Sequence, residues 1–453
     1  MPFIPHTPQE IQEMLSLLGV EQMEQLFAEI PADLFCQESF TLPAPLNEMG
    51  LTRLMRERAG QDRTMLCFAG AGAYEHHIPA AIWEIATRGE FYSAYTPYQA
   101  EASQGTLQVL YEYQSMMAAL LQMEVVNASL YDGATALAEA VFMAIRSKAN
   151  LPKRILLPES VHPHYRQVLH TILSGQGIEI AALPLSSHGH IDSSALAAYP
   201  AGSFAALVLA QPNFFGILEQ TDQLTDWAQQ QQSLVIAQVN PLSLGLLQPP
   251  GCWGSSGADI ACGEGQPLGI PLSSGGPYFG FMGCKQALLR QMPGRIAGRT
   301  RDKDQAEGFV LTLQAREQHI RRAKATSNIC TNQGLMTVAA TLYLTLLGPS
   351  GLQQTAAACH GNTMALANRL QRIPGVRLHF DRPFFHEIVL QLPKSAPAVL
   401  AALEQQQILG GVALGPYYPG MENMLLLCAT EMRTPSDIEQ LATALSAILA
   451  QES

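Results

Sequence analysis

Two apolar runs in the middle of the chain, Ala205-Ala-Leu-Val-Leu-Ala-Gln211 and Leu234-Val-Ile-Ala-Gln-Val239, carry the strongest structural signal. A helical pattern over residues 224–232 separates them. Strands that are apolar at nearly every position are buried on both faces, which is typical of parallel sheets. Right-handed helical connections between such strands build an open layer. The sequence therefore predicts an α/β fold with a mostly parallel sheet.

The same alternation continues on both sides of this stretch. Upstream, the pattern predicts helices over 132–148 and 162–174 and strands over 154–158 and 179–185. Downstream, it predicts strands over 376–380, 387–392, 412–414 and 424–429, a helix over 396–407 and a last helix after Thr434. Near the start, Thr7, Pro8 and Glu10 begin a helix that we expect to reach about residue 32. We predict an N-terminal helical arm (1–60), a large α/β domain (61–345) and a small C-terminal α+β domain (346–453).

The composition excludes several classes of protein. The chain has 453 residues and is 47% hydrophobic, which is too apolar for a disordered protein. Its formal net charge of −12 argues against nucleic-acid binding, which needs a basic surface. Only 14% of the residues are charged, against roughly 25% in ordinary domains, which indicates that a partner subunit covers part of the surface. We find no signal peptide, membrane span or CxxC pair, so we expect a cytoplasmic protein with buried free thiols.

Two segments are candidates for a binding site. The turn Asp132-Gly-Ala-Thr135 begins a helix, and such a turn either holds a phosphate or is simply capped by Asp132. A second loop presents Tyr95, Tyr98 and Gln99 within five residues. Its tyrosines either orient a small polar ligand or pack in a turn that Pro97 stiffens. Both interpretations stay open for each segment.

The other polar motifs give weaker signals. Histidine pairs such as His76-His77 lack i, i+4 spacing and a nearby carboxylate cluster, so we expect no metal site. There is no G-x-S-x-G elbow of a serine hydrolase, and Gly70-Ala-Gly72 is a tight turn rather than a dinucleotide fingerprint. Residues 285–324 are locally basic, and they either meet an anion or an acidic partner or form a solvated surface.

Several long motifs occur together in the chain: Ala71-Gly-Ala-Tyr-Glu-His-His-Ile-Pro79, Tyr95-Thr-Pro-Tyr-Gln-Ala-Glu-Ala-Ser-Gln-Gly105, Asn127-Ala-Ser-Leu-Tyr-Asp-Gly-Ala-Thr-Ala136, Asn240-Pro-Leu-Ser-Leu-Gly245, Gly263-Glu-Gly-Gln-Pro-Leu-Gly-Ile-Pro271, and the stretch 316–334. Together they resemble the P-protein (glycine decarboxylase) of the glycine cleavage system. The resemblance is strongest to the N-terminal-half subunit, subunit 1 of glycine dehydrogenase (decarboxylating), found where the protein is split into two chains. It runs nearly from end to end.

The resemblance implies a fold-type-I pyridoxal-phosphate (PLP) architecture with a seven-stranded sheet. It implies that glycine is decarboxylated as a PLP aldimine, that the aminomethyl group passes to the lipoyl group of H-protein, and that CO₂ is released. This chemistry needs a Schiff-base lysine and an acid on the pyridinium nitrogen. Where the family's catalytic half has a His-Lys pair, this chain has Gln266 and Pro267, and Ala237-Gln-Val-Asn240 carries no acid. We therefore expect no covalently bound cofactor here, and PLP on the partner, glycine dehydrogenase subunit 2.

The resemblance therefore predicts a non-cofactor-bearing subunit that is active only with its partner, in a dimer of heterodimers. Tyr95, Tyr98 and Gln99 become candidates for a loop that reaches the partner's substrate pocket. Asp132, Gly133 and Thr135 become a vestigial phosphate turn. Two other hypotheses remain: a catalytically decayed homologue that acts as a scaffold or regulatory subunit, and an autonomous PLP enzyme that uses Lys285.

Overall fold

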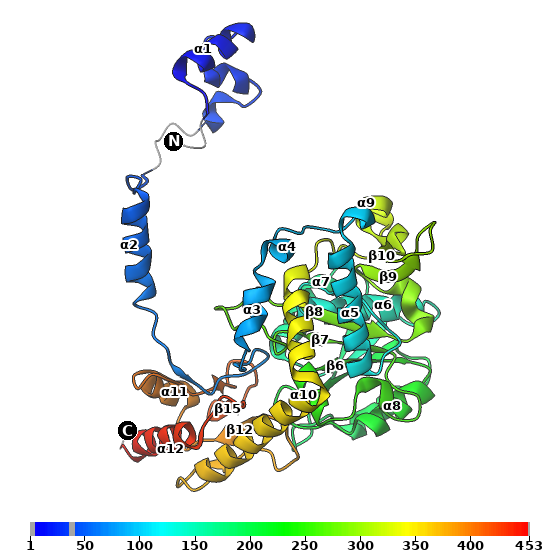
Figure 1. Ribbon diagram of the computed structural model, residues 1–453. Coiled ribbons are helices and arrows are strands. Elements are labelled where there is room, and N and C mark those ends of the chain that lie inside the picture. The colour runs from blue at the N-terminus through cyan, green and yellow to red at the C-terminus, as the bar shows by residue number, and fades with distance from the viewer. Residues whose placement is uncertain (1–4, 36–40, 452–453) are drawn as a thin grey trace. The chain divides into compact units, whose positions relative to one another are not determined.

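The computed structural model describes residues 5–35 and 41–451, and the chain separates into two compact units, Met1–Arg63 and Thr64–Ser453 (Figure 1). The first unit contains α1 (Pro8–Leu17) and α2 (Glu48–Ala59). The predicted start of α1 is confirmed, because Thr7 and Glu10 form a reciprocal capping box. The expected extension to residue 32 is wrong. The helix ends at Leu17, before Gly19 adopts a left-handed φ of +73°, a conformation that commonly terminates helices.

The second unit is built on a seven-stranded sheet in the order β2-β8-β7-β6-β5-β3-β4 (Figure 1). Its strands are β2 (Val125–Val126), β3 (Arg154–Pro158), β4 (Glu179–Leu183), β5 (Ala206–Gln211), β6 (Leu234–Val239), β7 (Ile260–Glu264) and β8 (Gly280–Cys284). The five strands from β3 to β7 are parallel, whereas β8 runs antiparallel to β7 and β2. The predicted mostly parallel sheet is confirmed, and the predicted ranges of β3 and β6 match to the residue.

Helices cover both faces of this sheet: α5 (Gln104–Leu121), α6 (Gly133–Ser147), α7 (Pro163–Leu173), α8 (Thr221–Gln230) and α10 (Gly334–Leu370). Neighbouring strand residues point to opposite faces. Val208 and Ile236 pack with α6 and α7 in one core, whereas Leu207 and Val235 pack with α5, α8 and α10 in the other. Burial on both faces explains why these strands show no polar alternation.

A four-stranded sheet follows near the C-terminus, in the order β11-β12-β15-β14. Its strands and helices are β11 (Arg377–Leu378), β12 (Glu387–Gln391), α11 (Ala396–Glu404), β14 (Val412–Ala413), β15 (Met424–Cys428) and α12 (Pro435–Ala450). All of them fall within or close to their predicted ranges. The predicted boundary at residue 345 lies inside α10, and the division of 61–453 into two domains stays a prediction.

The remaining elements are short: β1 (Leu66–Cys67), α3 (Ala80–Ala86), α4 (Gly89–Tyr92), β9 (Ile296–Arg301), β10 (Glu307–Thr312), α9 (Gln318–Arg321) and β13 (Ile408–Leu409). Among the described residues, only α10 has the length and apolar composition of a membrane span. It bends at Gly348-Pro349; the arm before the bend packs into one core of the second unit, and the arm after it contributes to that core and to a second one. Its apolar surface is therefore used in packing within the fold.

Candidate functional site

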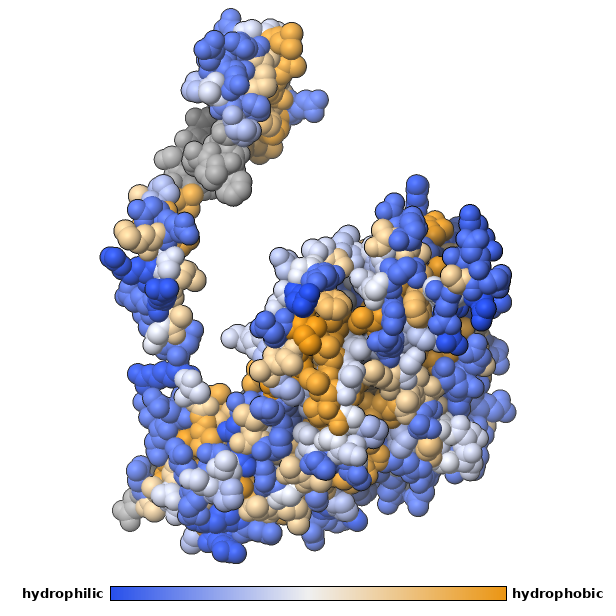
Figure 2. Space-filling model, viewed as in Figure 1, coloured by the Kyte–Doolittle hydropathy of each residue, from blue (hydrophilic) through white to orange (hydrophobic). Residues whose placement is uncertain are grey.

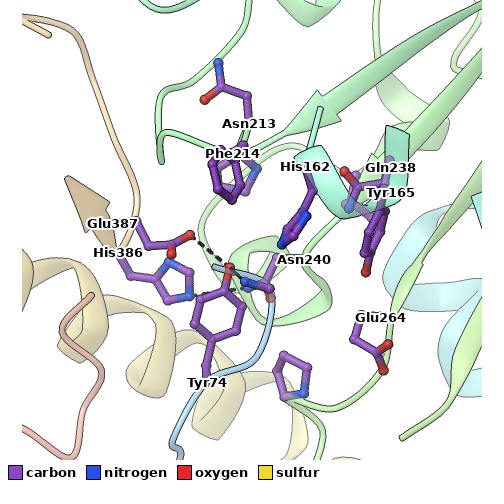
Figure 3. A pocket seen from close by; sticks show the side chains of 14 residues that line it. Tyr74, His162, Tyr165, Asn213, Phe214, Gln238, Asn240, Glu264, His386 and Glu387 are labelled. Atoms are coloured by element: carbon purple, nitrogen blue, oxygen red, sulfur yellow. Dashed lines mark hydrogen bonds between the residues drawn. The ribbon is translucent and has the colours of Figure 1, made fainter. Parts of the chain in front are cut away.

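Polar side chains collect at the carboxyl ends of β5, β6 and β7, where they line a cavity of about 50 Å³ (Figure 3). These strands contribute Asn213, Gln238, Asn240 and Glu264, and other segments contribute Tyr74, His162, Tyr165, His386 and Glu387. In open α/β sheets, ligands bind at this edge. The cavity is therefore the position at which the fold would hold a cofactor.

Glu387 joins the small sheet to the loop that precedes α3. Its Oε1 accepts the Ala71 N–H at 2.6 Å, and its Oε2 accepts the Tyr74 hydroxyl at 2.9 Å. Burial raises the pKa of Glu387 to about 7, and it also raises the pKa of the Tyr74 phenol well above its ordinary value. The two side chains thus form one hydrogen-bonded side of the cavity, and the Glu387 carboxyl group changes charge near neutral pH.

The cavity's histidines are neutral near pH 7. His162 donates from Nε2 to the Ala71 carbonyl at 2.7 Å and accepts the His164 N–H on Nδ1 at 3.1 Å. Burial lowers the pKa of His162 to about 4, and it lowers the pKa of His386 well below its ordinary value. No lysine or arginine occurs among the described lining residues, so this cavity offers no fixed positive charge.

The predicted phosphate turn begins α6 beside this cavity, and the carboxyl group of Glu264 already occupies a backbone donor of the turn. The Gly133 N–H donates to Glu264 Oε2 at 2.9 Å, and the Gln266 N–H donates to Oε1 at 3.1 Å. Asp132 caps the helix by accepting the Thr135 N–H at 2.8 Å. Burial raises the pKa of Glu264 to about 8. A phosphate would compete for the same donors, so the geometry favours a capped helix end, and the vestigial phosphate turn stays a prediction.

The positions that the resemblance singled out lie at the same cavity. Pro267 lines it, and Gln266, which is 1% exposed, binds both backbone polar groups of Tyr74 at 2.9 and 2.8 Å. Neither side chain can form an imine. Ala237 is buried and has no carboxyl group that could pair with a pyridinium nitrogen. The cavity is also far smaller than the roughly 300–1,000 Å³ of ordinary ligand pockets. The residues present here do not fit PLP.

Lys285 lies at the other end of β7. Its ammonium binds Asp259 Oδ1 at 2.7 Å and the Gly257 carbonyl at 3.1 Å. Asp259 precedes β7 and Glu264 ends it, so the strand rise places Lys285 roughly 17 Å from the cavity. The hypothesis of an autonomous PLP enzyme that uses Lys285 is therefore wrong.

The tyrosine loop borders a second cavity, of about 200 Å³, beside the N-terminus of α10. Tyr95 lines this cavity and is 79% exposed. The Tyr98 hydroxyl accepts a hydrogen bond from the Arg295 guanidinium at 3.1 Å, and Arg295, which is 3% exposed, also donates to Asn332 Oδ1. Gln99 does not line either cavity. The structure thus separates the tyrosine loop from the cavity that contains Glu264.

Comparison with known proteins places the chain in a family. Residues 1–445 match the family model described as glycine cleavage system P-protein. A probable glycine dehydrogenase (decarboxylating) subunit 1 from Nitrosospira multiformis is 59% identical over 99% of both chains. The protein of the same name from Methylococcus capsulatus is 58% identical over 99% of this chain and all of that one.

The chain belongs to the glycine cleavage system P-protein family. A crystal structure of glycine decarboxylase (P-protein) in inhibitor-bound form has a TM-score of 0.88 and 42% identity, over 99% of this chain and 100% of that one. A Burkholderia pseudomallei sphingosine-1-phosphate lyase has a TM-score of 0.67 at 15% identity, which shows the shared fold alone. The predicted fold-type-I PLP-enzyme architecture is thereby confirmed.

Sequence reasoning missed several polar residues of the P-protein fold's cavity. Tyr74 and Glu264 lie within motifs that carried the resemblance, but no spacing rule linked them to each other. His386 and Glu387 lie at the start of the distant strand β12, and their only sequence signal was a pair of polar residues beside an apolar strand. Packing of that strand against the loop before α3 brings them to the cavity.

Proposed function

We propose that this chain is subunit 1 of a two-chain glycine dehydrogenase (decarboxylating), which decarboxylates glycine and passes the aminomethyl group to the lipoyl group of H-protein. The full-length match to proteins of that name carries the proposal. The chain is an enzyme subunit that works with a partner, in keeping with the name of its relatives. No observation favours the alternative of a catalytically decayed scaffold.

PLP then belongs to the partner, glycine dehydrogenase subunit 2. Three features of this chain's own cavity support that assignment: Pro267 on its wall, the lack of a lysine among the described lining residues, and Glu264 on the donors that would hold a phosphate. PLP supplies an electron sink for decarboxylation when it is bound. This chain's contribution is then to complete and shield the partner's pocket.

The tyrosine loop is our candidate for that contribution. Tyr95 is a large, mostly exposed ring beside an open cavity, which is unusual unless another surface covers it. Arg295 holds Tyr98 through a hydrogen bond and through its guanidinium, which lies 5.3 Å from the ring centre. Buried Glu317 lies 3.6 Å from Arg295 and helps to fix it. The loop is therefore fixed at Tyr98 and exposed at Tyr95, as we expect of a segment that contacts a partner.

Exposed apolar surface supports a large interface with the partner. Figure 2 shows apolar side chains gathered over α10, where Leu346 is 53% exposed. An apolar hollow of about 660 Å³ lies between α5 and the bend of α10. The assembly we propose is a dimer of heterodimers that also receives lipoylated H-protein. Location in the cytoplasm remains a prediction from the sequence.

Reconstitution tests the proposal. Each chain is purified alone and together with the other, and glycine–bicarbonate exchange and the visible absorbance of bound PLP are measured. We expect absorbance from the partner, none from this chain, and exchange only from the mixture. Exchange by the partner alone at the rate of the mixture would contradict a catalytic contribution from this chain. A borohydride-reducible chromophore on this chain alone would contradict the assignment of PLP.

Conservative variants separate the enzymatic role from the scaffold role. In the reconstituted complex, Tyr95→Phe and Tyr98→Phe remove only hydroxyl groups, and we expect each to lower the exchange rate at least several-fold. Tyr92→Phe is the matched control, because Tyr92 is 64% exposed and lines neither cavity. Wild-type rates in both loop variants would favour a purely structural role for this loop.

A further inference from the structure

Three side chains from distant parts of the chain meet beside the first cavity without lining either cavity. His76 comes from the loop before α3, Cys359 from α10, and Glu431 from the loop after β15. His76 Nδ1 lies 2.8 Å from Glu431 Oε2, and Cys359 Sγ lies 3.1 Å from the same oxygen. One ligand atom of each residue falls within 4.8 Å of the others. A nitrogen, a sulfur and an oxygen donor therefore share one small volume.

This cluster is enclosed by the fold. The side chains of His76 and Glu431 are 2% and 15% exposed, and Cys359 is fully buried. Buried carboxylates are normally paired with a cation or coordinate a metal. Among the described residues, the only basic side chain within 4 Å of the Glu431 carboxylate is His76. Glu431 therefore lacks the arginine or lysine that balances most buried acids.

The surroundings already hold the donors in place. The His77 N–H donates to Glu431 Oε1 at 2.6 Å, which fixes the carboxylate and leaves Oε2 directed at His76 and Cys359. The Glu431 N–H donates to Cys359 Sγ at 3.3 Å and fixes the position of that sulfur. Outer hydrogen bonds of this kind orient ligands in metal sites.

We propose that His76, Cys359 and Glu431 bind one Zn²⁺ ion. Zinc accepts imidazole, thiolate and carboxylate ligands together, at about 2.0–2.3 Å in tetrahedral geometry. Such bond lengths separate ligand atoms by roughly 3.3–3.7 Å, so the imidazole nitrogen and the thiol sulfur each need to move away from Glu431 Oε2 by only a fraction of an ångström. The ion neutralises the buried carboxylate and thiolate, and a water molecule takes the fourth position.

The three ligands come from separate parts of the fold. Zinc there would tie the loop before α3 to α10 and to the segment between β15 and α12. The expectation of no metal site rested on sequence spacing, which could not show that His76 lies beside two residues more than 280 positions away in the chain. This inference is independent of the proposed enzymatic function.

Cobalt provides a spectroscopic test on the full-length chain. After dialysis against a chelator, Co²⁺ is titrated into the chain, and its tetrahedral bands and its thiolate charge-transfer band are recorded. We expect saturation at one equivalent and displacement by Zn²⁺, which binds such sites more tightly than Co²⁺. Absence of a saturable band at one equivalent would overturn the proposal.

Variants assign the ligands. Cys359→Ser should abolish the charge-transfer band, whereas Cys252→Ser, which changes an exposed cysteine outside the cluster, should leave the titration unchanged. Glu431→Gln should keep the sulfur band but weaken binding at least tenfold. A charge-transfer band that survives in Cys359→Ser, or unchanged affinity in Glu431→Gln, would contradict the site.

A measurement on the unmodified chain guards against variants that fail to fold. Ligands that bind only the folded state raise the unfolding midpoint in proportion to the logarithm of their free concentration. We expect the Tm to rise steadily with free Zn²⁺ and to fall after chelation. A Tm that does not respond to either treatment would overturn the proposal, because it would show that the three groups form only a hydrogen-bonded cluster.

Discussion

The buried carboxyl group of Glu264 accepts hydrogen bonds from two backbone donors, Gly133 at the start of α6 and Gln266 just after β7. Its pKa of about 8 lies well above the usual value of about 4.3, so the folded chain holds a proton that the unfolded chain has lost. The stabilisation that this raised pKa contributes is fully present below about pH 4.3 and is lost as the pH rises through 8. The free energy of unfolding should therefore fall with rising pH across this window, by at most about 1.4 kcal/mol per unit for this one group.

Glu264→Gln removes this titration. Chemical denaturation from pH 5 to 8 should give a flatter dependence on pH than in the wild type, with the difference between the two chains changing by about 1 kcal/mol per unit. Buried Glu387 contributes a similar slope to both chains, so only the difference is informative. Glu404→Gln, which changes an exposed acid at the end of α11, should run parallel to the wild type. Parallel curves for all three chains would contradict the raised pKa.

For single residues, the sequence showed which catalytic residues the cavity lacks more clearly than it showed which polar residues line the cavity. Gln266 and Pro267 stood at the positions of a known catalytic pair, and the structure places both at the cavity. Glu264 could not be assigned in advance, because its role depends on contact with Gly133, which lies far away in the sequence. Motifs identify chemistry that is local in sequence, whereas a carboxylate that caps another segment is visible only after folding.

At the level of one element, the bend in α10 leads to a testable prediction about Gly348. Gly348 has φ 59° and ψ −177°, a region that is essentially restricted to glycine. An added Cβ would meet nothing within 4 Å, so the penalty for Gly348→Ala is backbone strain alone, about 1–3 kcal/mol. Gly361→Ala is the control in the same helix, because Gly361 is exposed and an added Cβ is equally free. It should stabilise the chain by up to about 1 kcal/mol.

Thermal unfolding of the two variants measures this difference. The Tm should fall in Gly348→Ala and stay or rise in Gly361→Ala. Equal shifts in both would show that the bend does not require glycine. The bend was not predicted from the sequence, although Gly348-Pro349 marks it, because the apolar pattern continues on both sides. The same kind of error occurred at α1, where a continuous helical pattern hid the break at Gly19.

At the scale of the whole molecule, exposed apolar side chains are unevenly distributed along the chain. Large apolar residues that are exposed are concentrated in the first unit: Met14, Leu17, Leu18, Met23, Leu26, Phe27, Ile30, Leu34, Leu42, Leu46, Met49, Leu51 and Met55. A unit of this size cannot bury them within itself. The partner subunit predicted from composition is the surface most able to cover them, because obligate interfaces are rich in apolar contacts.

Deletion of residues 1–63 tests this expectation. The second unit keeps the seven-stranded sheet and both of its cores, so the truncated chain should fold with little change in Tm. Its affinity for the partner subunit should fall at least tenfold, because most of the exposed apolar side chains are lost. Sedimentation of the mixed subunits over a range of concentrations measures the dissociation.

As a control, Leu17→Ser and Leu18→Ser in the full chain should weaken association without affecting the second unit. Undiminished association of the truncated chain would place the interface entirely on the α/β unit and would leave the apolar surface of residues 1–63 to another partner.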